Sequence, residues 1–136
     1  MATGFADAHK TIEERVSTNW TSTSIAYENV QAKEFSDGDQ DWVRVTVIEG
    51  DSGQIGIGGV GAALHRNLGI VVIEVYTRED KGGRQARAHA DGLAALFRGV
   101  QDNDITFRTP RVLPVGVDEG WYQVNVQVPF QWDLQA

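Results

Sequence analysis

A chain of 136 residues, of which 41% are hydrophobic, can bury a real core, and its length predicts a single domain over residues 1–136. The absence of cysteine excludes disulfides, a thiolate metal site and a cysteine nucleophile. The net charge of −7 argues against broad electrostatic binding to nucleic acid or to an anionic membrane, because such binding needs a basic excess.

The N-terminal third of the chain predicts one helix and then an irregular segment. Apolar residues recur at three- and four-residue steps over roughly residues 5–20, which is the period of an amphipathic helix. Thr3 or Asp7 is suited to cap its start. Residues 21–41 are rich in Ser, Thr, Asp and Gln, and a loop of this length in a compact domain is often functional.

Two strands and a Gly-rich connection follow. Valines alternate with polar residues over residues 42–48, which predicts a strand, and residues 49–53 predict a turn. Residues 54–61 are Gly-rich and predict at most a weak returning strand. Residues 68–77 are β-branched and apolar on both faces except at Glu74, so we expect a central strand that is covered on both sides.

The C-terminal part predicts a second helix and further strands. An apolar face recurs over roughly residues 84–98, residues 104–117 predict a strand interrupted near Pro110 and Pro114, and residues 121–132 alternate strictly. The order of elements, without long crossovers between successive strands, predicts an α+β fold. We expect a mainly antiparallel mixed sheet of about four to five strands with two helices packed on it.

Residues 56–61 match the pattern G-x-G-x-x-G of dinucleotide-binding loops. That pattern must follow a buried strand and open a helix. Here a turn precedes it, and the next predicted strand begins too soon for a crossover helix. We therefore interpret the glycines as a hairpin or loop, with a small-ligand-binding domain kept as a distant alternative.

The histidines and acidic residues predict no catalytic, cofactor or metal site. No histidine has a recognised metal spacing, and no acid–base partner can be named for His89. Asp37, Asp39 and Asp41 alternate as at the start of a Ca²⁺ loop, but the twelfth position from Asp37 is Ile48 and not Glu. A solvated acidic loop is the favoured interpretation, and an interface role is a special case of it.

Two further patterns allow an interaction surface. Arg84 and Arg87 share the second predicted helix, where they form either a solvated face or a contact for another protein. The outward side of the last predicted strand is amide-rich and uncharged, with Gln123, Asn125, Gln127 and Gln131. Neutral amides suit a wet protein contact or the inside of a ring, although four positions could also share this character by chance.

Charge is unevenly spread along the chain. Residues 1–51 hold ten acidic and four basic residues, residues 52–65 hold none of either, and residues 66–111 hold six acidic and eight basic residues. Such asymmetry suits surfaces that meet head to tail. No secretion signal or apolar run of membrane-spanning length is visible, so we expect the protein to stay in a reducing cytoplasm.

Several segments together resemble the tail terminator, or tail completion, proteins of phages with long non-contractile tails. The resembling segments are Ile25–Val30, Trp42–Val47, Gly69–Val75, Ala90–Phe97, Gly120–Val126 and Val128–Phe130. The resemblance implies a small α+β protein without a catalytic site that forms a six-membered ring on the last ring of the tail tube. Such a ring stops tube growth at the length set by the tape measure and offers a surface for joining the head.

The resemblance implies partners and a location. The partners are further copies of the chain in a homo-hexameric ring, the major tail tube protein, a neck or head-completion protein and the tape measure protein. Neither a membrane nor direct nucleic-acid recognition is implied, beyond passage of DNA through the ring. The protein is expected at the head-proximal end of the virion tail, assembled in the host cytoplasm.

Candidate contact residues combine the resemblance with the acidic-loop and amide-face patterns above. We expect subunit or partner contacts at Arg44, Glu74, Arg84, Arg87, Asp37, Asp39, Asp41, Gln123, Asn125 and Gln127. The loops at residues 50–65 and 78–83 are expected on the ring faces or in its lumen. A different phage neck or head-completion protein is the nearer alternative.

Overall fold

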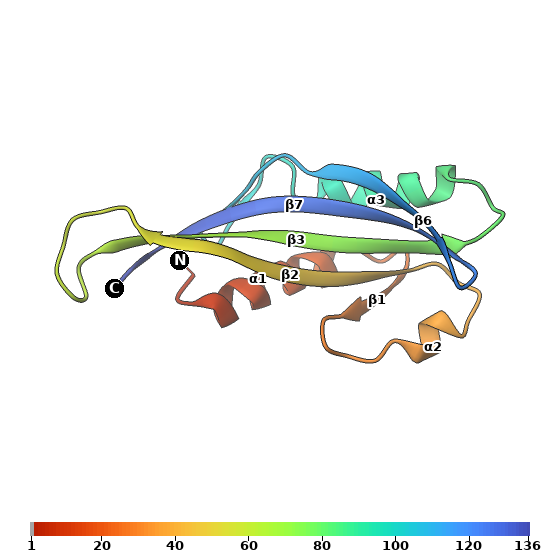
Figure 1. Ribbon diagram of the computed structural model, residues 1–136, viewed down its shortest axis with the longest axis horizontal. Helices are drawn as coiled ribbons and strands as arrows, with labels where there is room; N and C mark the ends of the chain where they lie inside the picture. Colours follow the sequence, from red (N-terminus) through yellow and green to blue (C-terminus); the bar gives the residue numbers. More distant parts are fainter. Residues whose placement is uncertain (1) are drawn as a thin grey trace.

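The computed structural model describes residues 2–136 and contains a seven-stranded sheet with helices packed against it (Figure 1). The elements are α1 (Phe5–Asn19), β1 (Ser24–Tyr27), α2 (Lys33–Ser36), β2 (Trp42–Gln54), β3 (Leu64–Arg78), α3 (Arg84–Ala95), β4 (Gln101–Asp102), β5 (Ile105–Phe107), β6 (Arg111–Asp118) and β7 (Trp121–Gln135). The strand order is β1-β2-β3-β7-β5-β4, and β6 also pairs with β7. Only the β1–β2 pair is parallel among the pairs within residues 2–136, so the predicted α+β fold with a mainly antiparallel mixed sheet is confirmed.

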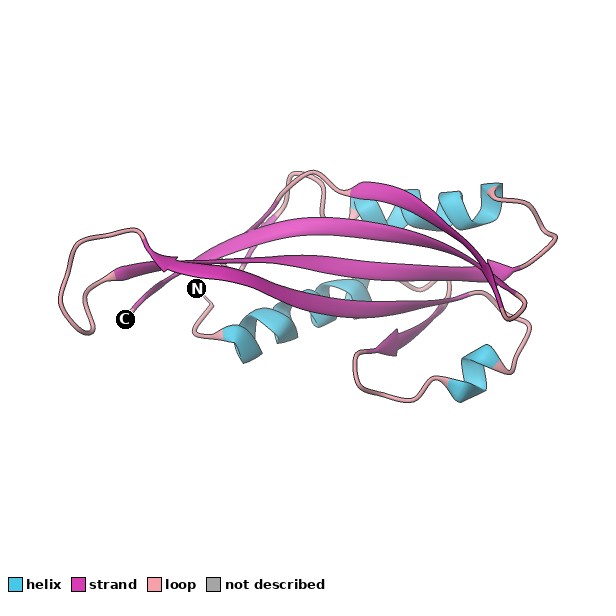
Figure 2. Ribbon diagram, viewed as in Figure 1, coloured by secondary structure: helices cyan, strands magenta, loops and turns pink. Residues whose placement is uncertain are grey.

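The main core lies between one face of the sheet and the two long helices, α1 and α3, which both lie behind the sheet in Figure 2. Alternate residues of a strand point to the same face, so the valines of β2, β3 and β7 form a continuous apolar surface. The fully buried residues of this surface and of the helices include Ile12, Val16, Val43, Val45, Val71, Ile73, Val75, Leu93, Phe97, Val124, Val126 and Val128. The predicted helices and the alternation of the last strand are confirmed.

The ends of the helices agree with the sequence to within a few residues. Gly4 is the N-cap of α1 and has no capping side chain, but the N–H of Thr3 donates to Asp7 Oδ2 at 3.0 Å. This bond, followed by one from Asn103, lowers the pKa of Asp7. Gly92 lets α3 approach Trp20, because a Cβ there would lie 2.8 Å from the Trp20 ring.

The β2–β3 hairpin is longer than the sequence predicts. The turn expected at residues 49–53 and the returning strand at 54–61 are wrong, because β2 continues to Gln54 and only residues 55–63 form the connection. A bulge between Glu49 and Ser52 shifts the register of the ladder, and pairing then continues from Ser52 to Gln54. The Ser52 hydroxyl also donates to Asn67 Oδ1 at 2.6 Å, so the hairpin is held together beyond the bulge.

The structure contains short elements that the sequence did not predict. The segment 21–41, predicted as irregular, contains β1 and α2, because Ile25 joins the main core and Ala26 packs under α2 on the other face. The single strand expected over 104–117 is divided between β5 and β6, and Pro110 lies in the break. A register shift between Pro114 and Gly116 confirms the predicted interruption.

The expectation that the central strand is covered on both sides is wrong within this chain. One face of β3 is buried in the main core, but Leu68 and Ile70 on the other face remain 39% and 38% exposed. We call the face of the sheet opposite α1 and α3 the open face. Its exposed apolar residues make it the first place to look for an interaction site.

Candidate interaction surfaces

The open face collects half of the predicted contact residues into one cross-strand row. Arg44 on β2 lies directly opposite Glu74 on β3, and Glu74 lies opposite Asn125 on β7. Gln123 and Gln127 flank Asn125 on the same face because side chains alternate along a strand. These five residues come from three strands that only the folded sheet brings together.

Contacts within this row fix some of its side chains. The amide of Gln123 donates to Asn125 Oδ1 at 2.8 Å, and the hydroxyl of Tyr76 donates to a carboxylate oxygen of Glu74. Burial, and then this hydrogen bond, raise the pKa of Tyr76 far above its ordinary value. The guanidinium of Arg44 lies over the Trp42 ring, 5.7 Å from its centroid, and its buried Nε has no hydrogen-bond partner among residues 2–136.

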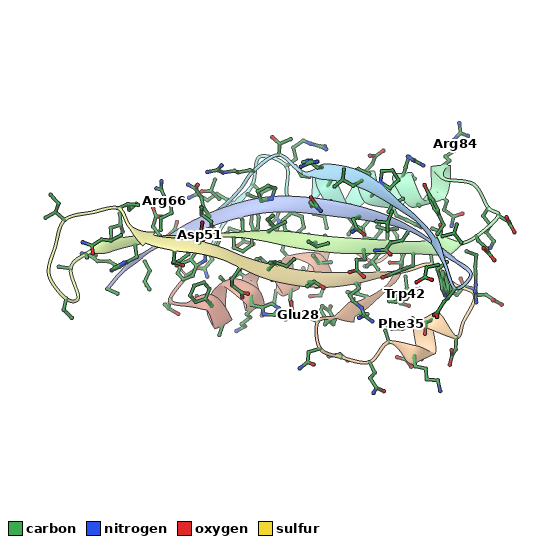
Figure 3. The ribbon with its side chains drawn as sticks, in the orientation of Figure 1. Glu28, Phe35, Trp42, Asp51, Arg66 and Arg84 are labelled. Atoms are coloured by element: carbon green, nitrogen blue, oxygen red, sulfur yellow. The ribbon has the colours of Figure 1, made fainter. Side chains whose placement is uncertain are left out.

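One end of the open face is covered by the chain itself. We call it the closed end, and it is a second buried cluster of Ala26, Ala32, Trp42 and Trp121, packed by Phe35 and Tyr76. The Trp42 and Tyr76 rings stack with centroids 4.2 Å apart, and Phe35 from α2 lies beside Trp42 in Figure 3. The indole N–H of Trp121 donates to the carbonyl of Ser36 at 3.2 Å, which attaches α2 to β7.

Arg78 attaches the acidic loop, residues 37–41, to the closed end. Its guanidinium lies over the Trp121 ring, 4.1 Å from the centroid, and donates to the carbonyl of Gly38 and to Asp39 Oδ1 at 3.2 Å. A cation over an indole face is attracted by the ring quadrupole. No local pattern indicates this role, because Arg78 lies about forty residues from Gly38 and Asp39 along the chain.

Asp41 is turned inward, which corrects the expectation of a wholly solvated loop. Its Oδ2 lies 2.9 Å from Nε2 of His89 on α3 and also accepts a hydrogen bond from Gln85. The two side chains are 12% and 18% exposed. His89 therefore has an acidic partner, contrary to the expectation from sequence, and Asp37 and Asp39 are the acids that remain exposed at this loop.

The two predicted arginines of α3 are exposed on the helix side of the sheet, away from the open face. Figure 3 shows Arg84 projecting outward from the start of the helix. Arg87 donates from Nη1 to the carbonyl of Gly83 and to the Tyr122 hydroxyl, both at 3.3 Å. The predicted contact residues thus form two groups, one on the open face and one on the helix side. The acidic loop lies at the closed end, where Asp41 contacts Gln85 and His89 of α3.

The other end of the open face has no such cover. Ile48 lies opposite Ile70, and Ile70 lies opposite the half-buried Pro129, so an apolar surface crosses three strands and is exposed on β2 and β3. We call Ile48, Leu68, Ile70, Val72 and Pro129 the open end. Beyond it the hairpin connection, residues 55–63, extends past the rest of the sheet, and we call it the tip (Figure 1).

The tip contains the G-x-G-x-x-G pattern of residues 56–61, and its context differs from that of a dinucleotide site. It joins two antiparallel strands, and β3 follows it where such a site would have a helix. Ile57 and Val60 within it are fully exposed. Over residues 2–136, no three His, Asp or Glu side chains gather as metal ligands would, and no helix has the length and apolar character needed to cross a membrane.

Comparison with known proteins gives a family and a fold. A family model described as phage tail terminator protein matches residues 7–130. One solved structure without a functional name matches with a TM-score of 0.63 and 16% identity, covering 94% of this chain and 96% of its own, and at that identity it shows the fold alone. No curated protein sequence matches.

Proposed function

The chain belongs to the phage tail terminator family, and from this premise we propose that it forms a six-membered ring that caps the head-proximal end of a tail tube. Family membership gives it a structural role in the phage tail, and the match over residues 7–130 is the observation that carries the proposal. We propose that the chain acts as one domain, by binding alone and without a cofactor. The ring would stop tube growth and offer the head a surface to join.

A terminator must bind one end of a polymer without extending it. A head-to-tail ring meets this requirement because closure uses both halves of the lateral interface. The two ring faces are then free to differ, one for the tube protein and one for a neck or head-completion protein. The separation of the open-face group from the helix-side group supports such a division.

Each group of predicted contact residues has a place in this proposal. Arg44, Glu74, Gln123, Asn125 and Gln127 would contact a neighbouring subunit or line the lumen through which DNA passes, since they share the open face. Arg84, Arg87, Asp37 and Asp39 are exposed away from that row and would meet the tube, the neck protein or the end of the tape measure protein. Assembly would take place in the host cytoplasm.

The decisive experiment compares tails made with and without this protein. In a phage that lacks its gene, overlong tube polymers are expected, and adding the purified protein should restore a uniform length. Tails of normal length that fail to join heads would instead identify a neck or head-completion factor. Negative-stain images of the protein mixed with tube polymers should show a ring at one tube end only.

Arg87→Glu tests the helix-side group within the same assay. Arg87 is exposed and its contacts to Gly83 and Tyr122 are long, so the fold should persist. The variant is expected to block tail completion by reversing a contact charge. Tails of normal length that join heads would remove Arg87 from the contact surface.

A further inference from the structure

The central strand carries more apolar surface than this chain covers. Residues 70–73 read Ile-Val-Val-Ile, a run typical of a strand buried on both faces. The helices cover one face through Val71 and Ile73, whereas Ile70 and Leu68 face outward beside Ile48. Exposed apolar side chains that form a continuous patch mark an interaction site, while scattered ones do not.

A second uncovered apolar feature lies on the same chain. Ile57 and Val60 of the tip are fully exposed, and Ile55 beside them is half exposed. Figure 1 shows the tip extending beyond the end of the sheet, so it does not fold back onto the open end of its own chain. A protruding apolar loop and a bare apolar sheet face are two different, complementary surfaces on one molecule.

Charge supports pairing these two surfaces with each other. Residues 52–65 contain no Asp, Glu, Lys or Arg, and the open end consists of Ile, Leu, Val and Pro side chains. Burying these side chains against one another desolvates no charged member of either set, which limits the cost of an interface, and the nearest charges on the same face are the paired Arg66 and Asp133 beside Leu68. The other charged residues described above lie in the row of Arg44 and Glu74, at the acidic loop and along α3, outside the two apolar surfaces.

From these observations we propose that the tip of one copy docks on the open end of the next copy, with Ile57 and Val60 against Ile70 and Leu68. The contact is heterologous, because each copy offers a tip to one neighbour and an open end to the other. A rotation that closes this contact gives a ring. The inference rests on the proposed ring and names the surfaces that form its lateral interface.

The absence of cysteine from the chain makes the contact directly testable. Val60→Cys and Ile70→Cys are made as separate full-length variants, mixed, and oxidised at concentrations up to those at which the ring forms. A disulfide-linked heterodimer is expected from the mixture, and the double variant should give a ladder that ends at the ring size. Val117→Cys, exposed on β6 at the other end of the sheet, is the matched control and should not cross-link to Val60→Cys.

A mixing experiment tests the direction of the contact. The double variant Ile57→Asp, Val60→Asp places charge on the tip, and Ile70→Asp places charge on the open end. Each variant alone should therefore associate at least about tenfold more weakly than wild type. Mixed together, they retain one intact tip and one intact open end, and a dimer without larger assemblies is expected. Circular dichroism on each variant confirms that the fold is retained.

Three results overturn the proposal. These are cross-linking of Val60→Cys to Val117→Cys but not to Ile70→Cys, cross-linking of Val60→Cys to the tube protein alone, and a protein that stays monomeric at every concentration and on tube ends. The proposed function is judged separately by tube length. A cap that limits length without the Val60–Ile70 cross-link refutes only the contact, and a ladder of rings that leaves tubes overlong refutes only the cap.

Discussion

At the closed end of the open face, α2 and the acidic loop cover Trp42 and Trp121, whereas at the open end Ile48, Leu68 and Ile70 have no cover from the chain. Both ends belong to the same three strands, β2, β3 and β7. The difference is therefore made by the segments outside the sheet. Residues 28–41 run beyond the β1 edge and bring α2 against Trp42 and Trp121, while residues 55–63 extend past the end of the sheet (Figure 1).

This contrast indicates that the closed end stabilises the monomer and that the open end serves association. The closed end is held by stacked rings, an arginine over an indole and hydrogen bonds to the acidic loop, so the isolated chain completes it. The open end keeps apolar surface in water, which is unfavourable unless a partner covers it. Variants at the closed end should change the stability of the monomer, and variants at the open end should change association.

The largest expected effect is that of Trp42→Ala, which should lower the free energy of unfolding by about 3–5 kcal/mol, because it leaves a cavity beneath α2. Leu68→Ala is the matched change at the open end and should cost about 1 kcal/mol or less in the monomer, because Leu68 is already exposed. Urea unfolding of both variants at low protein concentration measures the two costs. Equal costs would show that the two ends do not differ in this way.

Arg78→Ala should have the next largest effect, lowering the free energy of unfolding by about 1–2 kcal/mol. It removes the cation over Trp121 and the donors to Gly38 and Asp39. Hydrogen exchange of residues 36–41 should quicken as well, because Arg78 holds the loop against the sheet. Arg84→Ala, at an exposed arginine on α3, is the control and should stay within about 0.5 kcal/mol of wild type.

A smaller coupling is expected between Asp41 and His89, which join the acidic loop to α3. A double-mutant cycle with Asp41→Ala and His89→Ala should give a coupling energy of about 1 kcal/mol, since the pair is mostly buried and hydrogen-bonded. Unfolding curves of the two single variants and the double variant measure it. Strict additivity would mean that the contact contributes nothing to the closed end.

The sequence predicted the parts of the fold that have a clear period. Both long helices follow a 3.6-residue repeat, and burial along β7 alternates from Gln123 to Asp133. It did not predict β1 or α2, because four-residue elements have too little periodicity and are held by contacts made elsewhere in the chain. The run through β3 predicted a cover on both faces, and the structure shows that this chain supplies only one.

The candidate contact residues were predictable by type but not by grouping. Arg44, Glu74 and Asn125 became one row only through the register of three strands, which no local pattern contains. The partners of Arg78 and His89 lie about forty and forty-eight residues away, so spacing gives no signal for them. The exposure of Ile57 and Val60 likewise became evident only when the tip was seen to project.

The smallest expected effect concerns an ion pair at the base of the tip, where Arg66 on β3 faces Asp133 on β7. The guanidinium donates to both carboxylate oxygens, at 2.9 and 3.1 Å, and these hydrogen bonds lower the pKa of Asp133. A lowered pKa in the folded state adds stability above the ordinary Asp pKa of about 3.9 and loses it as the pH falls through the folded value. The contribution is therefore complete at pH 7, begins to decline below about pH 4 and is lost once the pH falls below the folded pKa of Asp133.

Asp133→Asn should remove that part of the pH dependence, so that the variant loses less stability than wild type between pH 7 and pH 3. Urea midpoints across this range measure the difference, which should be small because both groups are partly exposed. Arg66→Gln should flatten the profile in the same way, since it removes the other half of the pair. If Asp133→Asn and wild type lose stability in parallel, the pair does not hold the base of the tip, and the ladder between β3 and β7 is enough to position it.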